Sequence, residues 1–368
     1  MPKAEESVLE IDLNALAHNF KTIKSQLTPG VKFMSVIKAY AYGNDSVAIA
    51  QKLEELGTDY FAVAYTEEGI RLRKAGITSP ILILHSQPVN FPKIIEHCLE
   101  PNLYSARTLE LFIRIAEKQK QKDYPVHIKF NTGMNRLGFT EVNYYNIPEK
   151  IKKTSAIKIV SAFSHLAASE NWREREFTLS QIHNFSNLAT QLVKDIDYEP
   201  LLHICNTSAI FNYPKAGFSM VRSGLGLYGF ANDPKLNARL KPVGTLKTVI
   251  SQIQELEKGD TVGYGRAFKV KGPTRTATVP LGHADGIKRI YGHGKAGFFV
   301  NGKYAPIVGK VCMDIIMIDV TQIDCKEGDE VIVFGGPQHA TRFAAAGGTI
   351  PYELITGISQ RVTRKIIN

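Results

Sequence analysis

The chain has 368 residues, of which 44% are hydrophobic and 22% charged, and it carries a formal net charge of +10. This composition argues against a globally disordered chain, and the length suits about two domains. No apolar run approaches the roughly 20 residues that cross a bilayer, and the first residues lack the apolar core of a secretion signal. We therefore expect a cytoplasmic protein without a membrane partner.

The cysteine and charge patterns argue against three kinds of site. None of the four cysteines belongs to a C-x-x-C pair, so neither a zinc site nor a disulfide framework is predicted. His283 and Asp285 lack further ligand types nearby, and we expect no metal. Basic residues are scattered, and the densest run (118–122) is typical of a solvated helix end, which argues against a nucleic-acid partner. A basic surface would instead help to attract a phosphorylated cofactor.

The first two thirds of the chain alternate between two patterns. A short alternating run at 8–11 is followed by helix-period residues at 13–27, and further helical stretches include 45–56, 66–75 and 172–196. Eight strand-like runs lie among them: 33–37, 60–64, 81–84, 102–104, 126–130, 158–163, 202–205 and 219–221. Eight strands alternating with helices predict an α/β fold, a (β/α)8 TIM-type barrel over residues 12–235.

After Pro234 the helix-period pattern ends. Runs rich in Val, Ile and Thr, separated by glycine turns, follow at 243–256, 276–281, 297–300, 305–320 and 330–334. They predict a separate, mainly β domain over 236–368, to which residues 1–11 could belong. A short helix near 352–358 should close this domain.

Lys38 ends the first apolar run of the predicted barrel. A run of this kind indicates a strand buried on both faces. Burial disfavours an ammonium group, and a neutral amine can attack a carbonyl to form a Schiff base. Tyr42 could offer a phenol to an anion near the same strand end. Most lysines that follow a strand are solvated, so Lys38 alone does not decide the function.

Polar residues follow five of the eight predicted strands. A barrel of this kind places its active site at the carboxyl ends of its strands. The residues found at these ends are Lys38, then Lys129, Asn131, Thr132, Gly133 and Arg136, then Ser164 and His165, then Asn206, Thr207 and Ser208, then Arg222, Ser223 and Gly224. Their joint placement predicts one site, although each could separately be a helix cap or a salt bridge.

The last two loops of the predicted barrel are suited to a phosphate. Residues 206–208 and 223–226 supply hydroxyl groups, small side chains and approachable backbone N–H groups at the usual phosphate site of such barrels. The run 224–229 also matches G-x-G-x-x-G. It lacks the acidic residue about 20 positions later that a dinucleotide site requires. We therefore interpret it as a phosphate-binding turn.

Three further residues allow both a functional and a structural interpretation. A guanidinium keeps its proton in proteins, so Arg222 could present a permanent donor to a bound ligand. Arg222 could otherwise form a salt bridge at the barrel end. Tyr264, between two glycines, could be an acid/base with a lowered pKa or part of an ordinary β-turn. Asp314 could contact a substrate or cap a strand.

These segments together resemble the alanine racemase family over essentially the whole chain. The matching stretches, in the family's order, are V-I-K-A-Y-A-Y-G-N, K-F-N-T-G-M-N-R-L-G, S-H-L-A, H-I-C-N-T-S-A, V-R-S-G-L-G-L-Y-G, V-G-Y-G-R, G-H-A-D-G, V-C-M-D and P-Y-E-L. The resemblance implies a homodimeric isomerase with shared active sites. It would interconvert L- and D-alanine by two-base proton abstraction on a pyridoxal 5′-phosphate aldimine and supply D-alanine for peptidoglycan.

The resemblance also implies roles for individual residues. Lys38 would hold the cofactor and act as one base, and Tyr264 of the partner subunit as the other. Arg222 would face the pyridine nitrogen, and His165 would link it to Tyr264. Arg136 would contact the ring phenolic oxygen and the substrate carboxylate, and Lys129 beside it would be a possible carbamylated lysine. Met313 and Asp314 would lie on the substrate side of the second subunit. The residues implied around the cofactor are Tyr42, Asn206, Thr207, Ser223, Gly224, Leu225 and Tyr352.

Other proteins related in architecture remain alternatives. A broad-specificity amino-acid racemase would share every catalytic residue. A diamino-acid decarboxylase would place an acid at the pyridine nitrogen, and Arg222 and Tyr264 argue against it. A non-enzymatic cofactor carrier would lack the β domain. Asn135 and His283 stand where the family commonly has glycine and tyrosine, at the substrate entrance.

Overall fold

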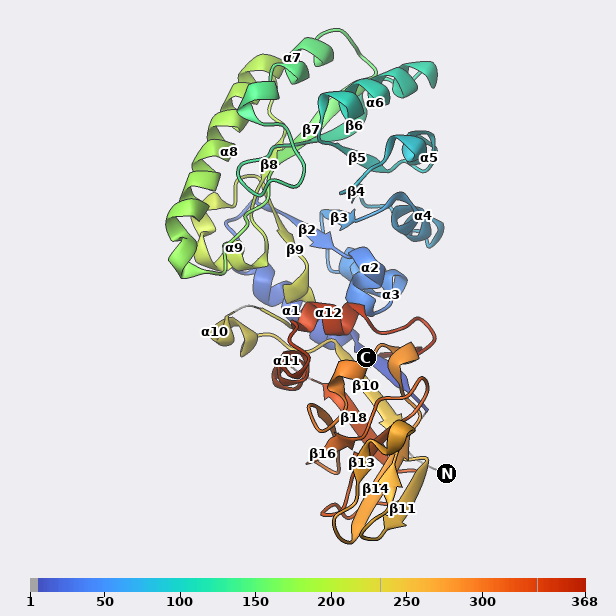
Figure 1. Cartoon of the computed structure of the whole chain (residues 1–368). Helices are drawn as coiled ribbons and strands as arrows, with labels where there is room; N and C mark the ends of the chain where they lie inside the picture. The colour runs from blue at the N-terminus through green and yellow to red at the C-terminus, as the bar shows by residue number, and fades with distance from the viewer. Residues whose placement is uncertain (1–5, 232, 336) are drawn as a thin grey trace.

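The N-terminal part of the chain forms a parallel β/α barrel, seen at the top of Figure 1 in a computed structural model that describes residues 6–231, 233–335 and 337–368. Its sheet runs β8-β7-β6-β5-β4-β3-β2-β9. The backbone N–H of Ser219 donates to Leu202 O (3.0 Å) and that of Arg222 to Cys205 O (3.1 Å), which closes the barrel between β8 and β9. The strands are β2 Lys32–Val36, β3 Tyr60–Val63, β4 Ile81–Ile83, β5 Glu100–Leu103, β6 Tyr124–Lys129, β7 Ile157–Phe163, β8 Leu201–His203 and β9 Met220–Ser223. The predicted barrel is confirmed.

Helices follow most of these strands and cover the barrel's outside. In α6, for example, the buried residues Leu109, Phe112, Ile113 and Ala116 recur at helical spacing, and Ser105 caps the first turn by accepting from Thr108 N (3.2 Å). None of the described helices is both long and apolar enough to cross a bilayer. The barrel helices are α1 Leu13–Lys24, α3 Ser46–Glu55, α4 Thr66–Lys74, α5 Phe91–Glu96, α6 Ala106–Lys118, α7 Asn146–Ile151, α8 Arg175–Ile196 and α9 Thr207–Asn212.

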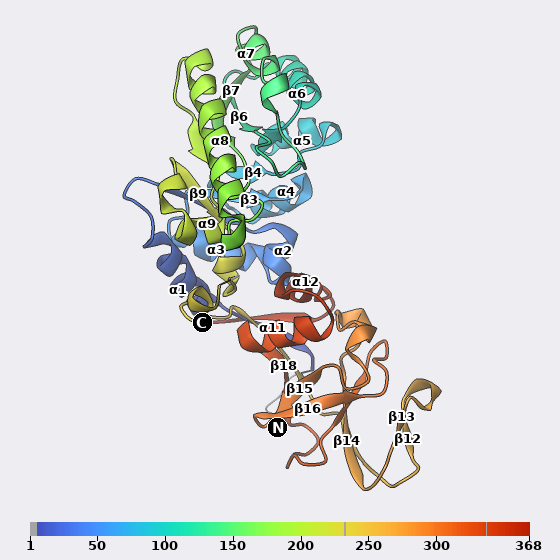
Figure 2. The ribbon, with the colours of Figure 1, turned by 60° about the vertical axis from the view of Figure 1, so that its left-hand side comes forward.

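The second part of the chain is built on a nine-stranded sheet ordered β11-β14-β17-β16-β15-β18-β10-β1-β19. Strand β1 (Val8–Asp12) pairs antiparallel with β10 and parallel with β19, so the chain's first strand belongs to this sheet. A small hairpin of β12 (Thr261–Val262) and β13 (Phe268–Lys269) projects from the far end of the domain (Figure 2). The other strands are β10 Gly244–Val249, β11 Gln252–Leu256, β14 Thr274–Val279, β15 Gly297–Val300, β16 Lys303–Val308, β17 Ile316–Asp319, β18 Glu330–Gly335 and β19 Thr363–Ile367.

The expectation that helices are absent between Pro234 and the closing helix is wrong. Helix α10 (Pro234–Asn237) and helix α11 (Pro337–Ala346) both lie in this region. In α11 the buried residues Ala340, Phe343 and Ala344 form one short apolar stripe, and the Phe343 ring lies 4.4 Å from that of Tyr291. A stripe of three residues is too short to stand out in a strand-rich sequence. The predicted short helix is present as α12 (Pro351–Thr356), but it does not close the domain, because strand β19 follows it and pairs with β1.

Helix α12 joins the β domain to the barrel (Figure 1). It packs against the turn that follows β2, labelled α2 (Lys38–Gly43). Gly43 has φ +86°, and a Cβ placed there would lie 2.1 Å from the carbonyl oxygen of Ile355. Arg364 Nη2 also donates to Gly43 O (2.9 Å). The interface between the two parts therefore requires a glycine directly after the turn that carries Lys38.

We expect Gly43→Ala to lower the free energy of unfolding more than Gly30→Ala does. Gly30 has a similar φ of +89°, and no atom lies within 4 Å of the point that a Cβ would occupy, so its substitution should cost only the roughly 1–2 kcal/mol of a left-handed alanine. Gly43→Ala adds a backbone clash to the same strain. Urea unfolding of the two variants measures the difference, and equal losses would contradict this account of the interface.

Candidate active site

A cavity of about 570 Å³ opens at the carboxyl ends of the barrel strands. It gathers side chains from β2, β6, β7 and β9 and from the loops that follow β2, β3, β4, β6, β7, β8 and β9, while α12 of the β domain contributes one tyrosine. The lining includes these residues singled out from the sequence: Lys38, Tyr42, Lys129, Arg136, His165, Asn206, Thr207, Arg222, Gly224, Leu225 and Tyr352. Residues spread over more than 300 positions of the sequence therefore share one site.

Lys38 is followed by an unusual backbone turn. Ala39, Tyr40, Ala41 and Tyr42 all have φ between +53° and +55°, the left-handed helical region. Each L-residue in this region costs roughly 1–2 kcal/mol, so the turn must be held by its surroundings. Tyr42 is buried, and its ring lies 4.7 Å from that of Tyr228 and 6.1 Å from that of Tyr352. The turn thereby directs Tyr42 into the cavity that also contains Lys38.

Glu68 fixes the start of this turn. Its Oε1 accepts the backbone N–H of Ala39 (2.5 Å), and its Oε2 accepts those of Ala64 (2.7 Å) and Tyr65 (3.0 Å). Glu68 was not among the site residues predicted from the sequence. A glutamate at the third position of a helix is a recognisable capping signal, but its bond to Ala39 depends on the packing of α4 beside β2. Glu68 is therefore a positioning residue that only the tertiary structure identifies.

The two lysines at the cavity are poised toward their neutral forms. Burial lowers the pKa of Lys38, the Arg136 cation lowers it further, and the Glu68 carboxylate acts in the opposite direction. Burial, with the nearby cations Arg222, Arg136 and Lys38, lowers the pKa of Lys129 to about 7. Lys129 Nζ also lies 4.7 Å from the centroid of the Phe163 ring. The shift makes each amine a better nucleophile or base than a solvated lysine, and Lys129 titrates near neutral pH.

Arg222 is almost completely buried and is surrounded by acceptors. It donates to Ser164 O (2.7 Å), to His203 Nδ1 (2.7 Å) and O (3.2 Å), to His165 Nδ1 (3.2 Å) and to Ile204 O (3.2 Å). Within the described ranges no carboxylate pairs with it, which disfavours the salt-bridge interpretation. These bonds all use Nη1 and Nη2, so among the described residues the Nε–H donor remains for a ligand.

His165 accepts from Arg222 at Nδ1, which leaves its proton on Nε2. Burial lowers the pKa of His165 well below its ordinary value, and the Arg222 cation adds to this effect. Burial also lowers the pKa of Arg222, to about 10, so the guanidinium stays charged at neutral pH. At this end of the cavity a fixed cation therefore faces a neutral imidazole.

The loops after β8 and β9 form a small anion-binding surface. Thr207 Oγ1 and Ser223 Oγ are 3.0 Å apart, and Ser223 is fully buried behind Thr207, so it supports the surface without lining the cavity. A Cβ at Gly224 would lie 2.4 Å from Tyr42 Oη. Asn206 Oδ1 caps α9 through Ala209 N (3.0 Å). Hydroxyl groups and glycine backbone at this place suit a phosphate group.

Tyr264, Met313 and Asp314 lie outside the cavity of their own chain. Tyr264 is 73% exposed in the turn between β12 and β13, a hairpin that Figure 2 shows at the end of the molecule away from the barrel. Met313 is 58% exposed, and Asp314 pairs with Arg361 (2.7 Å), which also bonds the buried Asp285 (2.6 Å). The barrel and these three residues can share a site only if a second molecule supplies them.

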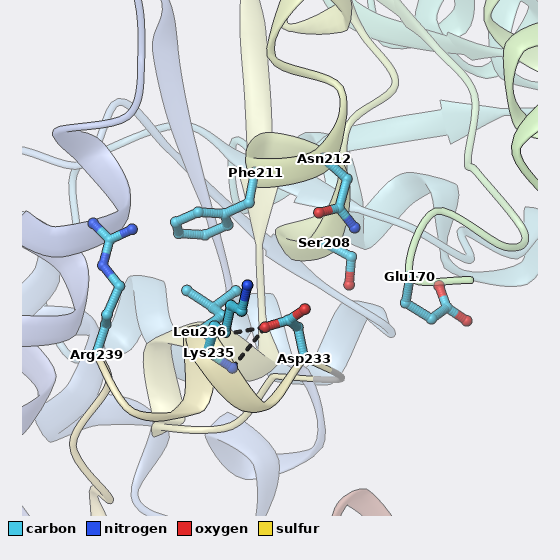
Figure 3. Close-up of a pocket in the computed structure, with 8 residues that line it drawn as sticks. All are labelled: Glu170, Ser208, Phe211, Asn212, Asp233, Lys235, Leu236 and Arg239. Atoms are coloured by element: carbon cyan, nitrogen blue, oxygen red, sulfur yellow. Dashed lines mark hydrogen bonds between the residues drawn. The ribbon is translucent and has the colours of Figure 1, made fainter. Parts of the chain in front are cut away.

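A smaller cavity of about 180 Å³ lies beside the first and shares Glu170 and Ser208 with it (Figure 3). Its most prominent acidic group, Asp233, caps α10 by accepting from Lys235 N (2.7 Å) and Leu236 N (3.0 Å). The guanidinium of Arg239 lies 5.7 Å from the centroid of the Phe211 ring. The groups of this cavity thus have local structural roles, and the site chemistry lies in the larger cavity.

The fold and the site define a two-domain barrel protein with a lysine of lowered pKa in the cavity at the barrel mouth. The model of "Alanine racemase, N-terminal domain" matches residues 11–232, and that of "Alanine racemase, C-terminal domain" matches residues 243–366. An alanine racemase of Halothermothrix orenii is 39% identical over 98% of this chain and 96% of its own length. The chain belongs to the alanine racemase family.

Solved structures agree over the whole chain. The alanine racemase of Clostridium difficile 630 is 36% identical with a TM-score of 0.92, covering 99% of this chain and 96% of that one. The enzyme of Bartonella henselae, solved with covalently bound pyridoxal phosphate, is 28% identical with a TM-score of 0.89, covering 99% of this chain and all of that one. Both domains and their arrangement therefore follow the family.

We expect Glu68→Gln to lower the pKa of Lys38 further and Arg136→Gln to raise it. The Glu68 carboxylate favours the ammonium form, and the Arg136 cation disfavours it. The measurement is the pH dependence of acetic anhydride labelling of Lys38 in the cofactor-free protein, followed by mass spectrometry. Glu67→Gln is the control, because Glu67 is an exposed neighbour on the same helix that pairs with Lys93. Unchanged or inverted shifts would contradict the assigned electrostatics.

Proposed function

We propose that this chain interconverts L-alanine and D-alanine with pyridoxal 5′-phosphate held in the 570 Å³ cavity, and that it supplies D-alanine for peptidoglycan in the cytoplasm. One observation carries the proposal: a lysine with a lowered pKa and a buried guanidinium with a free Nε–H line the same cavity. The covalently bound pyridoxal phosphate of the Bartonella henselae relative supports the choice of cofactor.

The residues of the cavity fit this cofactor. The Lys38 amine is nearer its neutral form, as covalent attachment requires. Position 224 lies so close to Tyr42 Oη that only a glycine fits there. The hydroxyl of Thr207 and the backbone of this loop match a phosphate group. Arg222 Nε–H would donate to a pyridine nitrogen and would keep that nitrogen unprotonated. When bound, the cofactor supplies an electron-withdrawing ring that stabilises negative charge at Cα of the amino acid.

Racemisation needs two bases on opposite faces of the substrate. Lys38 takes or returns the Cα proton on one face, and Tyr264 of the partner subunit does so on the other. Each such transfer contributes on the order of 10²–10⁴ in rate. The exposure of Tyr264 and its distance from the cavity of its own chain support a homodimer with shared sites. Neutral His165, with its proton on Nε2, would link Tyr264 to Arg222.

Arg136 binds the substrate carboxylate in this proposal. It lines the cavity and lies close enough to Lys38 to lower that lysine's pKa. Met313 and Asp314 would face the substrate entrance from the second subunit. The functional units would be a barrel of residues 12–235 and a β domain of 236–368 that includes residues 1–11, as the pairing of β1 with β10 and β19 supports. A decarboxylase is disfavoured because Arg222 occupies the place where it would carry an acid.

Two inactive variants should restore each other if the sites are shared. Lys38→Met and Tyr264→Phe each remove one base, so either dimer alone should not racemise alanine. In a mixed dimer one site contains both defects and the other contains neither. An equimolar, randomly reassociated mixture should therefore recover about one quarter of the wild-type rate, since half of the dimers are mixed and have one intact site.

The measurement is NMR of L-alanine in D2O with pyridoxal phosphate, followed by chiral chromatography. Wild-type protein should lose the Cα proton signal and produce D-alanine. No recovery in the mixture would place Tyr264 in the site of its own chain, whereas activity of Tyr264→Phe alone would place Tyr264 outside the reaction. Exchange without D-alanine in the wild type would contradict the two-base assignment. Carbon dioxide release from diamino acids without racemisation would contradict the proposed function.

We also propose that Lys129 reacts with carbon dioxide to form a carbamate, with release of one proton, which would give Arg136 and Arg222 a nearby anion. The support is its pKa of about 7, lowered by burial and three cations, which leaves the amine mostly neutral above that pH. With 13C-bicarbonate we expect a carbamate NMR signal that grows as the pH rises through 7 and is lost in Lys129→Met. Lys247→Met is the control, because Glu10 and Glu330 raise the pKa of Lys247 and keep it charged. A signal that persists in Lys129→Met would refute the assignment.

A further inference from the structure

A file of polar side chains crosses the interior of the barrel below Arg222. Barrel interiors are normally filled by branched apolar side chains, so buried polar groups there require an explanation. Here Glu100, His127, Ser161 and His203 stand on the consecutive strands β5, β6, β7 and β8, and each is at most 8% exposed. They occupy inward positions on four neighbouring strands and end at Arg222 on β9.

The file is continuously hydrogen-bonded. His127 Nε2 lies 2.6 Å from Glu100 Oε2, and His127 Nδ1 lies 2.5 Å from Ser161 Oγ. Ser161 Oγ lies 3.0 Å from His203 Nε2, and His203 Nδ1 lies 2.7 Å from Arg222 Nη1. The His203 ring also stacks on Phe163, with centroids 4.9 Å apart and planes 7° apart. The guanidinium at the cavity is thus linked to a buried carboxylate on the other side of the barrel.

The two ends of the file determine the direction of every hydrogen bond in it. Arg222 can only donate, so His203 Nδ1 accepts and His203 Nε2 carries the proton. Ser161 Oγ accepts a hydrogen bond from His203 Nε2–H and donates its hydroxyl proton to His127 Nδ1. The proton of His127 is therefore on Nε2, which is directed at Glu100. In this order each imidazole carries its proton on Nε2, and Glu100 Oε2 accepts the last hydrogen bond of the file. A proton on His127 Nδ1 would leave the Ser161 hydroxyl without an acceptor in the file.

The file also meets a charge requirement. Four basic side chains line one cavity, namely Lys38, Lys129, Arg136 and Arg222. Among the described residues, Glu100 is the carboxylate that is hydrogen-bonded to this group through the barrel interior. The other ionisable groups near Glu100 are Tyr60, Arg73 and Tyr124. Hydrogen bonds in series polarise one another in a low-dielectric interior, so the Glu100 charge acts on Arg222 across the file.

We propose that Glu100, His127, Ser161 and His203 form a relay that positions Arg222 and stabilises its charge, so that Nε–H is directed into the cavity. The four residues are positioning residues, because none of them lines the cavity. The consequence for the pyridine nitrogen rests on the proposed function, whereas the relay itself is a property of the cofactor-free chain. Breaking the relay should therefore reduce kcat without weakening binding of the substrate carboxylate, which Arg136 carries out.

The first test uses cofactor-free protein with 15N-labelled histidine. His127 and His203 are assigned by the loss of their NMR signals in His127→Asn and His203→Asn. We expect each ring to carry its proton on Nε2, whatever the protein's activity, because the hydrogen bonds of the file fix that tautomer. A proton on Nδ1 of either ring would overturn the relay. Because no cofactor is present, this result is independent of the proposed racemase chemistry.

The second test uses Ser161→Ala and Glu100→Gln with pyridoxal phosphate bound. Removing a residue that supports a site residue typically costs 10–100-fold, so we expect kcat to fall about 10-fold or more while KM for alanine changes less than about twofold. The absorption maximum of the bound cofactor should shift in both variants. Ser35→Ala is the control, because the Ser35 side chain is equally buried in the barrel and bonds Thr58 (2.8 Å), which is not a member of the file.

Three outcomes would overturn the relay. Wild-type kcat and absorption in Glu100→Gln would do so even if Ser161→Ala fails to fold. An equal loss of kcat in Ser35→Ala would also overturn it, because that loss would indicate a general effect of barrel destabilisation. A rise in KM in Ser161→Ala and Glu100→Gln that parallels the fall in kcat would likewise do so, because it would place the effect at the substrate carboxylate. If wild-type protein did not racemise alanine while the histidine tautomers were as expected, the proposed function would fail and the relay would stand.

Discussion

Burying a guanidinium is the constraint around which the barrel mouth is arranged. An unpaired buried charge costs several kcal/mol, so Arg222 is stable only where acceptors surround it. The carbonyls of Ser164, His203 and Ile204 and the rings of His165 and His203 supply them. These groups lie at the ends of β7 and β8, and the Arg222 backbone itself helps to close the barrel through Cys205. Barrel closure and the chemistry of the site therefore depend on the same residue.

The second constraint is the left-handed turn after Lys38. Four L-residues in this conformation are unfavourable in isolation, and two different parts of the protein hold them. Glu68 fixes the start of the turn from the barrel side, and α12 covers its end at Gly43 from the β domain. Tyr352 enters the cavity from the same helix. The cavity is consequently a joint product of both domains, although most of its residues belong to the barrel.

Sequence patterns predicted the barrel because its strands are buried on both faces and read as continuous apolar runs between helices. Patterns failed at α11, whose stripe of Ala340, Phe343 and Ala344 covers only one side of a sheet. Most proposed site residues could be singled out because they are polar and directly follow these apolar runs, where the strands end. Glu68 and Glu100 could not, since each looks like an ordinary surface residue until the neighbouring strand or helix supplies its partner.

The sequence by itself determined the fold class and the family, and it singled out most of the residues proposed for the site, because periodicity and local motifs depend only on neighbouring residues. The tertiary structure decided how these groups behave. The lowered pKa of Lys129, the free Nε–H of Arg222 and the exposure of Tyr264 on a distant hairpin all depend on contacts between segments far apart in the chain. Burial and hydrogen-bond direction arise only when strands pack side by side, so no local pattern contains them.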